Sequence, residues 1–262
     1  MLAAERVLQL LVADPDLGAD LPAGEEERAR RHIVVPSLTL SVGDEALLAR
    51  RMDHPGLIGF LVVDGLLLRQ IEVAGTVAAE LIGAGDLIHP GDVRASDLTP
   101  LNGRLRWTVL AQTELAVLDG VFSARAAEWP QIFGRIALRA VWRTHGLALN
   151  LAISHQARIE DRLLLLFWHL AQRWGRVSPE GVRLALPLTH QTLAKLVSAQ
   201  RPTVTNALGV LRERRLLLRR EDRSWLLPLP IPAELEPLLA RRGVRGRAAP
   251  AGPTGAAGPG RM

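Results

Sequence analysis

The spacing of apolar and polar residues changes along the chain and divides it into segments of different predicted structure. Residues 1–35 begin with apolar positions at helical spacing, and their run GEEERARRHIVV places acids before arginines, as a helix dipole favours. From Leu38 to Leu118 the chain consists of short apolar runs separated by glycine-containing or polar turns, among them LIGFLVV, LLLRQIEV and RWTVL. We predict a helical leader over 1–35 and a small antiparallel β-barrel or jelly roll over 36–122.

A long helical pattern follows this strand region. The segment WPQIFGRIALRAVWRTHGLALNLAIS has no proline after Pro130, a residue that suits a first helical turn. Small and apolar residues recur in it at alternating steps of four and three, which two helices can share across a symmetry axis. We interpret residues 123–156 as a dimerisation helix; packing of the same stripe against the chain's own barrel is the alternative. The stripe consists of Phe133, Ala137, Ala140, Thr144, Leu147, Leu151 and Ser154.

The last part of the chain reads as a separate domain. A helix with a wide apolar face, IEDRLLLLFWHLAQRW, stops at Gly175, and the linker VSPEGVRLALPL follows it. We predict a winged helix-turn-helix DNA-binding domain over residues 157–229. Residues 243–262 are rich in proline, alanine, glycine and arginine, and we expect them to be a disordered tail.

Residues 189–214 carry the spacing of the helix-turn-helix itself. Thr189 suits the N-cap of a short helix that ends near Val197, and a second helix follows with Pro202 in its first turn. Ser198 occupies the turn position where glycine is usual, because that residue often needs a positive φ. The predicted inward stripe consists of Leu193, Ala194, Val197, Val204, Ala207, Leu208 and Leu211.

The outward face of this helix pair carries side chains of the types that bond to base edges or phosphates. The following LLLRREDRSWLL reads as a β-hairpin wing whose arginines can reach flanking phosphates. Residues 195–262 hold 13 basic and 5 acidic side chains, a net charge of +8, which favours a polyanionic partner; a solvated arginine-rich tail is the alternative. The candidate DNA contacts are Thr189, His190, Gln191, Arg201, Thr203, Thr205, Asn206, Arg212 and Arg220.

Composition excludes several other classes of protein. The chain has no cysteine, which rules out disulfides, thiolate catalysis, zinc fingers and cysteine-held iron–sulfur clusters. No apolar run reaches the roughly 18 residues of a membrane span and no signal peptide is evident, so we expect a soluble cytoplasmic protein with no membrane partner. No nucleophile elbow, phosphate loop or metal-ligand cluster is present, and we predict neither an enzyme nor a metal site.

The order of barrel, long helix and winged helix resembles the Crp/Fnr family of bacterial transcription regulators over residues 34–227. The motifs that carry the resemblance are THQTLAKLVSAQRPTVTNALGVLRERRLL and, in the barrel, GFLVVDGLLLRQIEVAGTVAAELIGAGDLI. It implies an α+β fold with a cyclic-nucleotide-binding-like barrel that senses an effector. It also implies a homodimer that binds double-stranded DNA with one recognition helix in each of two half-sites.

The match to the family's DNA-binding motif can be followed residue by residue. Arg201 stands closest to the base-reading arginine, and Thr203 and Gln191 match positions at phosphates. Pro202 and Asn206 stand where many relatives have an acidic residue and a second arginine. The family's usual operator sequence is therefore not implied.

The barrel departs from the family's nucleotide-binding pattern. In members that bind a cyclic nucleotide, Gly-Asp-x-x is followed by Gly-Glu, whose glutamate holds the ribose, and a later Arg-Ser or Arg-Thr pair grips the phosphate. Here GDLI is followed by His89 and Pro90, and in NGRLRWTVL no hydroxyl residue follows Arg104 or Arg106 directly. Loss of both contacts costs enough to abolish micromolar binding, so we predict no ordinary response to cyclic AMP and no cofactor.

The effector, if one exists, would meet other residues. The candidate effector pocket consists of Asp86, His89, Arg104 and Arg106. Together with Asp86 and His89, His54 could bind a metal or another ligand, but scattered histidines are more often surface or structural residues. His145, His155 and His169 fall on predicted helices and are interpreted as packing or interface residues.

The sequence also allows one alternative to a DNA-binding regulator. The same barrel and winged helix could form a protein-interaction module that contacts RNA polymerase or another protein rather than reading DNA.

Overall fold

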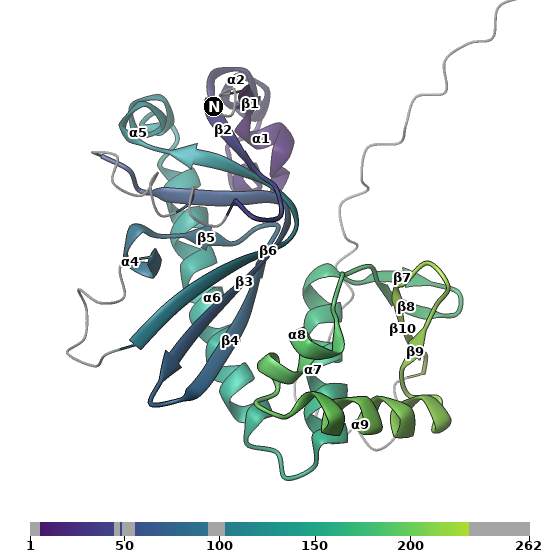
Figure 1. Ribbon diagram of the computed structural model, residues 1–262. Helices are drawn as coiled ribbons and strands as arrows, with labels where there is room; N and C mark the ends of the chain where they lie inside the picture. Colours follow the sequence, from purple (N-terminus) through teal and green to yellow (C-terminus); the bar gives the residue numbers. More distant parts are fainter. Residues whose placement is uncertain (1–5, 45–47, 49–55, 94–102, 231–262) are drawn as a thin grey trace, which may run out of the picture.

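A computed structural model describes residues 6–44, 48, 56–93 and 103–230, and Figure 1 shows the chain in it. A curved sheet covered by helices forms the N-terminal part, and a smaller helical body with its own sheet forms the C-terminal part. His54 and the expected disordered tail lie outside the described residues. Within the described ranges, no helix is long and apolar enough to cross a membrane.

Residues 6–35 are helical only in part, which corrects the expected helical leader. Strand β1 (Arg6–Gln9) precedes helix α1 (Leu10–Ala13), the 3₁₀ turn η1 (Pro15–Gly18) and helix α2 (Glu26–His32). Strand β1 pairs antiparallel with β2 (Val34–Leu40), so it covers the backbone groups of that edge. This long-range pairing determines its conformation, and local apolar spacing does not reveal it.

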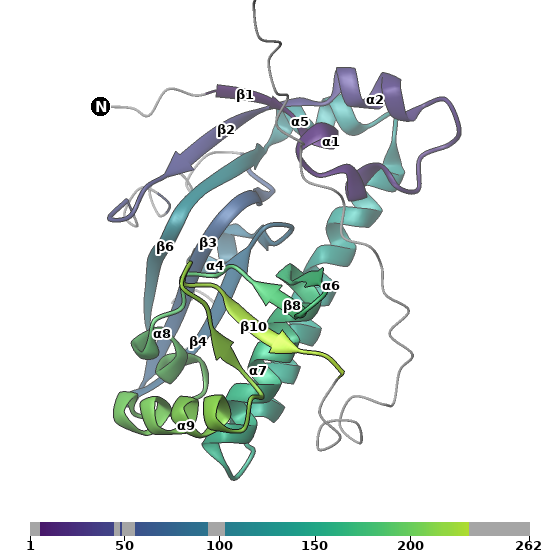
Figure 2. The same cartoon turned by 90° about the vertical axis from the view of Figure 1, so that its right-hand side faces the viewer.

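The N-terminal strands form an antiparallel sheet in the order β1-β2-β6-β3-β4, with β5 also paired to β3. Strands β3 (Gly59–Val73), β4 (Thr76–Gly83), β5 (Leu87–Ile88) and β6 (Gly103–Leu118) complete it. The predicted antiparallel jelly-roll class is confirmed. Figure 2 shows the sheet curving beside helix α6.

A bulge in β3 exchanges the two faces of that strand. Phe60 and Val62 face the interior core before the bulge, whereas Leu67 faces it afterwards, and the pairing with β6 shifts register between these positions. Gly65 lies in this stretch with φ +98°, and a Cβ there would approach the carbonyl oxygen of Gln112 to 2.3 Å. Only glycine fits this close backbone approach.

The helix predicted over residues 123–156 is two helices. Helix α5 (Gly120–Ala126) is capped by Asp119, whose carboxylate accepts hydrogen bonds from the backbone N–H groups of Val121 and Phe122. Helix α6 runs from Pro130 to Ser154, with the proline in its first turn as expected. A short helix, α4 (Pro90–Val93), lies between β5 and β6.

The C-terminal body begins with helix α7 (Ile159–Trp174) and strands β7 (Arg176–Ser178) and β8 (Gly181–Leu184). Helices α8 (His190–Leu196) and α9 (Arg201–Glu213) follow, and strands β9 (Leu218–Arg219) and β10 (Trp225–Pro228) form the hairpin after them. The four strands make a second antiparallel sheet in the order β7-β8-β10-β9.

The two bodies share one apolar core. Leu66, Leu68 and Leu81 on the outer face of β3 and β4 belong to the same buried cluster as Phe167 and Leu193. At the end of α7, the indole N–H of Trp174 donates to the carbonyl of Ala84 at 3.2 Å, and Arg173 pairs with the buried carboxylate of Asp86 at 2.6 Å. The loop between β4 and β5 therefore anchors α7 to the sheet.

Candidate nucleic-acid interface

Local capping and turn chemistry shape the helix-turn-helix. The Thr189 hydroxyl accepts a hydrogen bond from the backbone N–H of Thr192 at 3.0 Å, as the predicted N-cap should. Ser198 adopts φ +51°, the left-handed conformation expected at this turn, and glycine would remove a cost of about 1 kcal/mol there. Pro202 lies in the first turn of α9, where no backbone N–H is needed.

The inward face of the two helices is closed by apolar packing. All members of the predicted inward stripe are buried, and Val204 and Val197 are fully inaccessible. Because α9 packs against α7 through this stripe, its opposite face is presented to solvent. The exposed residues of that face include Arg201, Thr203, Thr205, Asn206 and Arg212.

Two of the predicted contact residues bind each other. The Nδ1 atom of His190 lies 2.9 Å from the hydroxyl of Thr205, and that hydroxyl donates to the carbonyl of Arg201 at 3.0 Å. Since a hydroxyl has a single proton and this one is given to Arg201, the Nδ1 atom of His190 is the donor in its bond to Thr205. The pair ties the start of α8 to α9 and sets the position of the exposed face.

A groove of about 620 Å³ lies between α8, α9 and the wing hairpin. Thr189, His190 and Thr205 line one side, and Arg219 and Arg223 line the wing side. The guanidinium of Arg219 stacks over the Trp225 ring at 4.2 Å, and burial together with the nearby Arg223 lowers the pKa of Arg219. Arginine nevertheless stays charged in proteins, so the groove is cationic.

Arg220, the wing residue predicted to contact DNA, is exposed but does not line this groove, which Arg219 and Arg223 line. Asp222 fixes this turn, because its carboxylate accepts hydrogen bonds from the backbone N–H of Ser224 at 2.9 Å and from the Ser224 hydroxyl at 2.6 Å. These bonds, with Arg183 and Arg220 nearby, lower the pKa of Asp222. The pairing of Arg219 with Trp225 in the hairpin positions Arg219, whereas Arg223 lies in the turn between the two strands.

The four residues of the candidate effector pocket do not lie together. Asp86 is buried and paired with Arg173, whereas His89 is exposed and its ring nitrogen accepts a hydrogen bond from the Gly91 backbone at 3.0 Å. Arg104 and Arg106 are exposed on β6. Because side chains alternate along a strand, these two arginines lie on the face opposite Trp107, which belongs to the interior core.

A cluster of four charged residues lies where α6 and α4 meet the sheet. Arg143 of α6 binds Glu80 at 2.7 Å and Asp92 at 2.5 Å, and Arg69 of β3 binds the same Glu80 at 2.8 Å. All four side chains are at most 17% exposed. Burial alone would lower the pKa of Arg143, but its hydrogen bonds to Glu80 and Asp92 outweigh burial and raise that pKa above its ordinary value.

The sequence interpretation missed this charge cluster. Glu80 is the single acid in the apolar strand TVAAELIG, and Arg69 interrupts the apolar run GLLLRQIEV. A charge inside such a strand is usually paired when buried, and that is the signal that could have found it. Its partners on α4 and α6 lie too far along the chain for any local pattern to identify them.

Comparison with known proteins gives the C-terminal domain a family. Residues 157–235 match the model of the Crp-like helix-turn-helix domain. The Global nitrogen regulator of Synechococcus elongatus is 37% identical over 63 residues, which are 24% of this chain and 28% of that protein. The regulatory protein CysR of the same organism is 34% identical over 83 residues, 30% of this chain and 40% of that protein. The match spans less than half the length of these curated relatives.

Solved structures extend the likeness in fold to most of the chain. A cyclic nucleotide-binding domain containing protein from Listeria monocytogenes has a TM-score of 0.56 at 14% identity, covering 81% of this chain and 96% of that one. A mutant of CooA from Carboxydothermus hydrogenoformans has a TM-score of 0.55 at 16% identity, covering 87% and 93%. The chain thus combines a barrel and long helix of this fold with a Crp-like helix-turn-helix domain. Residues 157–235 are thus a Crp-like helix-turn-helix domain, as the sequence motifs implied.

Proposed function

We propose that this protein binds a two-half-site DNA operator as a homodimer, with α9 of each protomer in a major groove. The observation that carries the proposal is the exposed face of α9 from Arg201 to Arg212, which adjoins the cationic groove of the wing. The arginine, threonine and asparagine side chains there are of the types that read base edges and phosphates. The curated relatives, whose names describe them as regulators, support the same use.

Selection of genomic DNA fragments by the purified protein tests this function. We expect enrichment of an inverted repeat whose half-site centres lie about 34 Å, or one helical turn, apart. Recovery of no preferred sequence at moderate salt would contradict it. That result would favour the alternative function, in which the winged helix contacts RNA polymerase or another protein.

The proposed dimer rests on the outer face of α6. Leu147 and Leu151 of the predicted stripe are 41% and 62% exposed, although another face of the helix packs on the chain's own barrel through Ile132 and Ile136. Burying such an apolar stripe against a second copy would remove this exposure. The stripe is shorter than the sequence suggested, because Phe133 packs on Phe122 with ring centroids 5.6 Å apart.

Leu151→Glu is expected to weaken the dimer at least about a hundredfold, because it places a charge in an apolar interface. Light scattering at micromolar concentration measures the change as a shift towards the monomer mass. Leu149→Glu is the matched control, since Leu149 lies on the same helix but faces away from the stripe. A monomeric wild-type protein, or an unchanged dimer of Leu151→Glu, would show that the stripe has another role.

We further propose that ordinary cyclic AMP control is absent. The residues at the family's ribose-binding position are His89 and Pro90, and the next acid, Asp92, is paired with Arg143. A buried guanidinium with two carboxylate partners would have to be displaced before a ligand could use either of them.

A further inference from the structure

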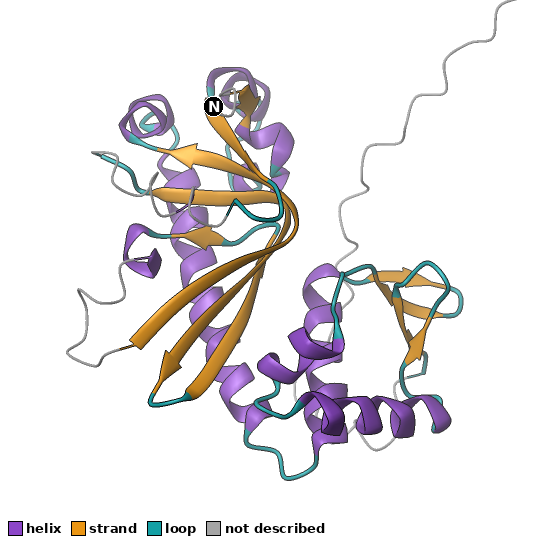
Figure 3. Cartoon of the chain, in the orientation of Figure 1, coloured by secondary structure: helices purple, strands orange, loops and turns teal. Residues whose placement is uncertain are grey.

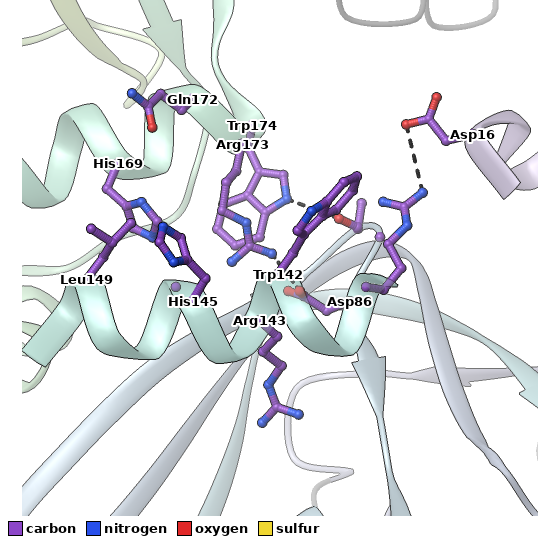
Figure 4. Close-up of a pocket in the computed structure, with 14 residues that line it drawn as sticks. Asp16, Asp86, Trp142, Arg143, His145, Leu149, His169, Gln172, Arg173 and Trp174 are labelled. Atoms are coloured by element: carbon purple, nitrogen blue, oxygen red, sulfur yellow. Dashed lines mark hydrogen bonds and ion pairs between the residues drawn. The ribbon is translucent and has the colours of Figure 1, made fainter. Parts of the chain in front are cut away.

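A cleft of about 430 Å³ lies between α6, α7 and the loop that joins β4 to β5, as Figure 4 shows. Its volume falls in the range of sites for small molecules. The cleft lies outside the interior core of the barrel, and its α6 residues Trp142, Gly146 and Leu149 lie on a different side of the helix from Thr144 and Leu151 of the proposed dimer stripe. It therefore stays open whether or not the chain dimerises.

Aromatic rings with unused hydrogen-bonding groups form the walls. Trp142 and Trp174 lie near each other in Figure 4, with His145 and His169 beside them. No hydrogen bond joins the side chain of Trp142, His145 or His169 to another described residue, and Trp142 remains 47% exposed. Burial, followed by the nearby charges of Arg173 and His145, lowers the pKa of His169 to about 4. Its neutral ring offers one donor and one acceptor.

Two guanidinium groups stand at the rim of the cleft. Arg139 is held by Asp14 at 2.9 Å and lies 5.8 Å from the Trp142 ring centroid. Arg173 is held by Asp86 through a single nitrogen and stacks 4.2 Å from the centroid of Trp174. A guanidinium has five N–H donors, so both retain N–H groups that these carboxylates do not use. An anionic group placed between them would gain charge-assisted hydrogen bonds.

Gly85 leaves room for the guanidinium of Arg139 beside the cleft. Gly85 has φ +87°, and a Cβ there would lie 2.6 Å from the Nη1 atom of Arg139. Any side chain at this position would displace the guanidinium. The loop therefore leaves room for an Arg139 nitrogen that points toward the cleft rather than toward Asp14.

We propose that this cleft binds a small planar aromatic carboxylate. The ring lies against the indoles of Trp142 and Trp174, and the carboxylate accepts hydrogen bonds from Arg139 and Arg173. Because α7 packs against α9, an occupied cleft would fix the angle between the barrel and the DNA-binding domain. That consequence for DNA binding rests on the proposed function, whereas binding in the cleft does not.

Fluorine NMR of protein labelled with 5-fluorotryptophan tests the proposal, because the chain has 6 tryptophans and each reports on one place. With salicylate at millimolar concentration as the probe, we expect saturable shifts of the Trp142 and Trp174 resonances and none of the Trp107, Trp129 or Trp225 resonances. Single tryptophan-to-phenylalanine variants assign the signals. No shift, or a shift of Trp107 in the barrel interior alone, would overturn the proposal.

Two glycine-to-leucine substitutions on α6, one in the cleft and one away from it, show whether salicylate binds in the cleft or whether any change of a helical glycine alters its binding. Gly146→Leu fills the cleft, where a Cβ would already lie 3.8 Å from Nε2 of His169, and should weaken the salicylate response at least about tenfold. Gly134→Leu is the control, because nothing lies within 4 Å of a Cβ there and both changes replace a helical glycine. Equal salicylate responses of the two variants would show that salicylate does not occupy the cleft. Benzyl alcohol has an aromatic ring but no carboxylate, and if it binds as tightly as salicylate, the proposed contact of the carboxylate with the arginines is wrong. Salicylate binding without any DNA binding would contradict only the proposed function.

Discussion

Arg201→Ala is expected to weaken specific operator binding roughly thirtyfold or more. An arginine that bonds bidentately to a base is worth about 1–3 kcal/mol, and a dimer loses two, so the loss is roughly 2–6 kcal/mol in affinity. The fold should not change, because Arg201 is exposed at the start of α9 and alanine is a good helix former. Fluorescence anisotropy with the selected operator, at one fixed salt concentration, measures the effect.

The ratio of specific to non-specific affinity separates base reading from general attraction to DNA. Arg176→Ala is the matched control: it removes an exposed arginine from β7, away from α9, and should leave that ratio unchanged. If Arg201→Ala lowers the affinity for all sequences equally, the residue contacts phosphate only. If it leaves operator binding intact, Arg201 does not contact DNA and the proposed interface is misplaced.

Glu80→Ala is expected to lower the free energy of unfolding by about 3–5 kcal/mol, the range found when one partner of a buried ion pair is removed. Glu80 is buried and contacts both Arg69 and Arg143, so its loss leaves two guanidinium groups without their shared carboxylate. Urea denaturation followed by circular dichroism measures the change. Asp64→Ala, at an exposed position of the same sheet, should change the free energy by less than about 0.5 kcal/mol.

A double variant shows whether Glu80 and Arg143 of the charge cluster stabilise the fold through their contact with each other. The double variant Glu80→Ala with Arg143→Ala should lower the free energy of unfolding by less than the sum of the two single variants. Each single substitution leaves the other side chain buried without its partner, and the double variant removes both charges. Strict additivity would mean that the two side chains do not interact in solution. A loss below about 1 kcal/mol in Glu80→Ala would show that the cluster is solvated.

Local chemistry explains which features the sequence predicted correctly. The cap at Thr189, the proline in the first turn of α9 and the positive φ of Ser198 depend only on neighbouring residues, and all three are observed. The jelly-roll class followed from strand-length apolar runs. The inward stripe of α8 and α9 followed from helical spacing, and it is buried as expected.

Features that depend on distant contacts were missed. Strand β1 extends because β2 offers an edge, and the charge cluster joins residues as far apart as Arg69 and Arg143. The bulge at Gly65 also reverses which residues of β3 face inward, so a single alternating pattern cannot describe that strand. For Arg104 and Arg106 the alternation around Trp107 was present in the sequence and would have placed them outside.

The shared core between β3, β4 and α7 has a mechanical consequence. A rotation of the C-terminal body away from the sheet would expose Leu66, Leu68 and Leu81 and would break the contacts of Trp174 with Ala84 and of Arg173 with Asp86. Any signal that reorients α9 must therefore supply the free energy of opening this seam. These contacts therefore oppose any hinge movement of the C-terminal body against the barrel at the junction of α6 and α7.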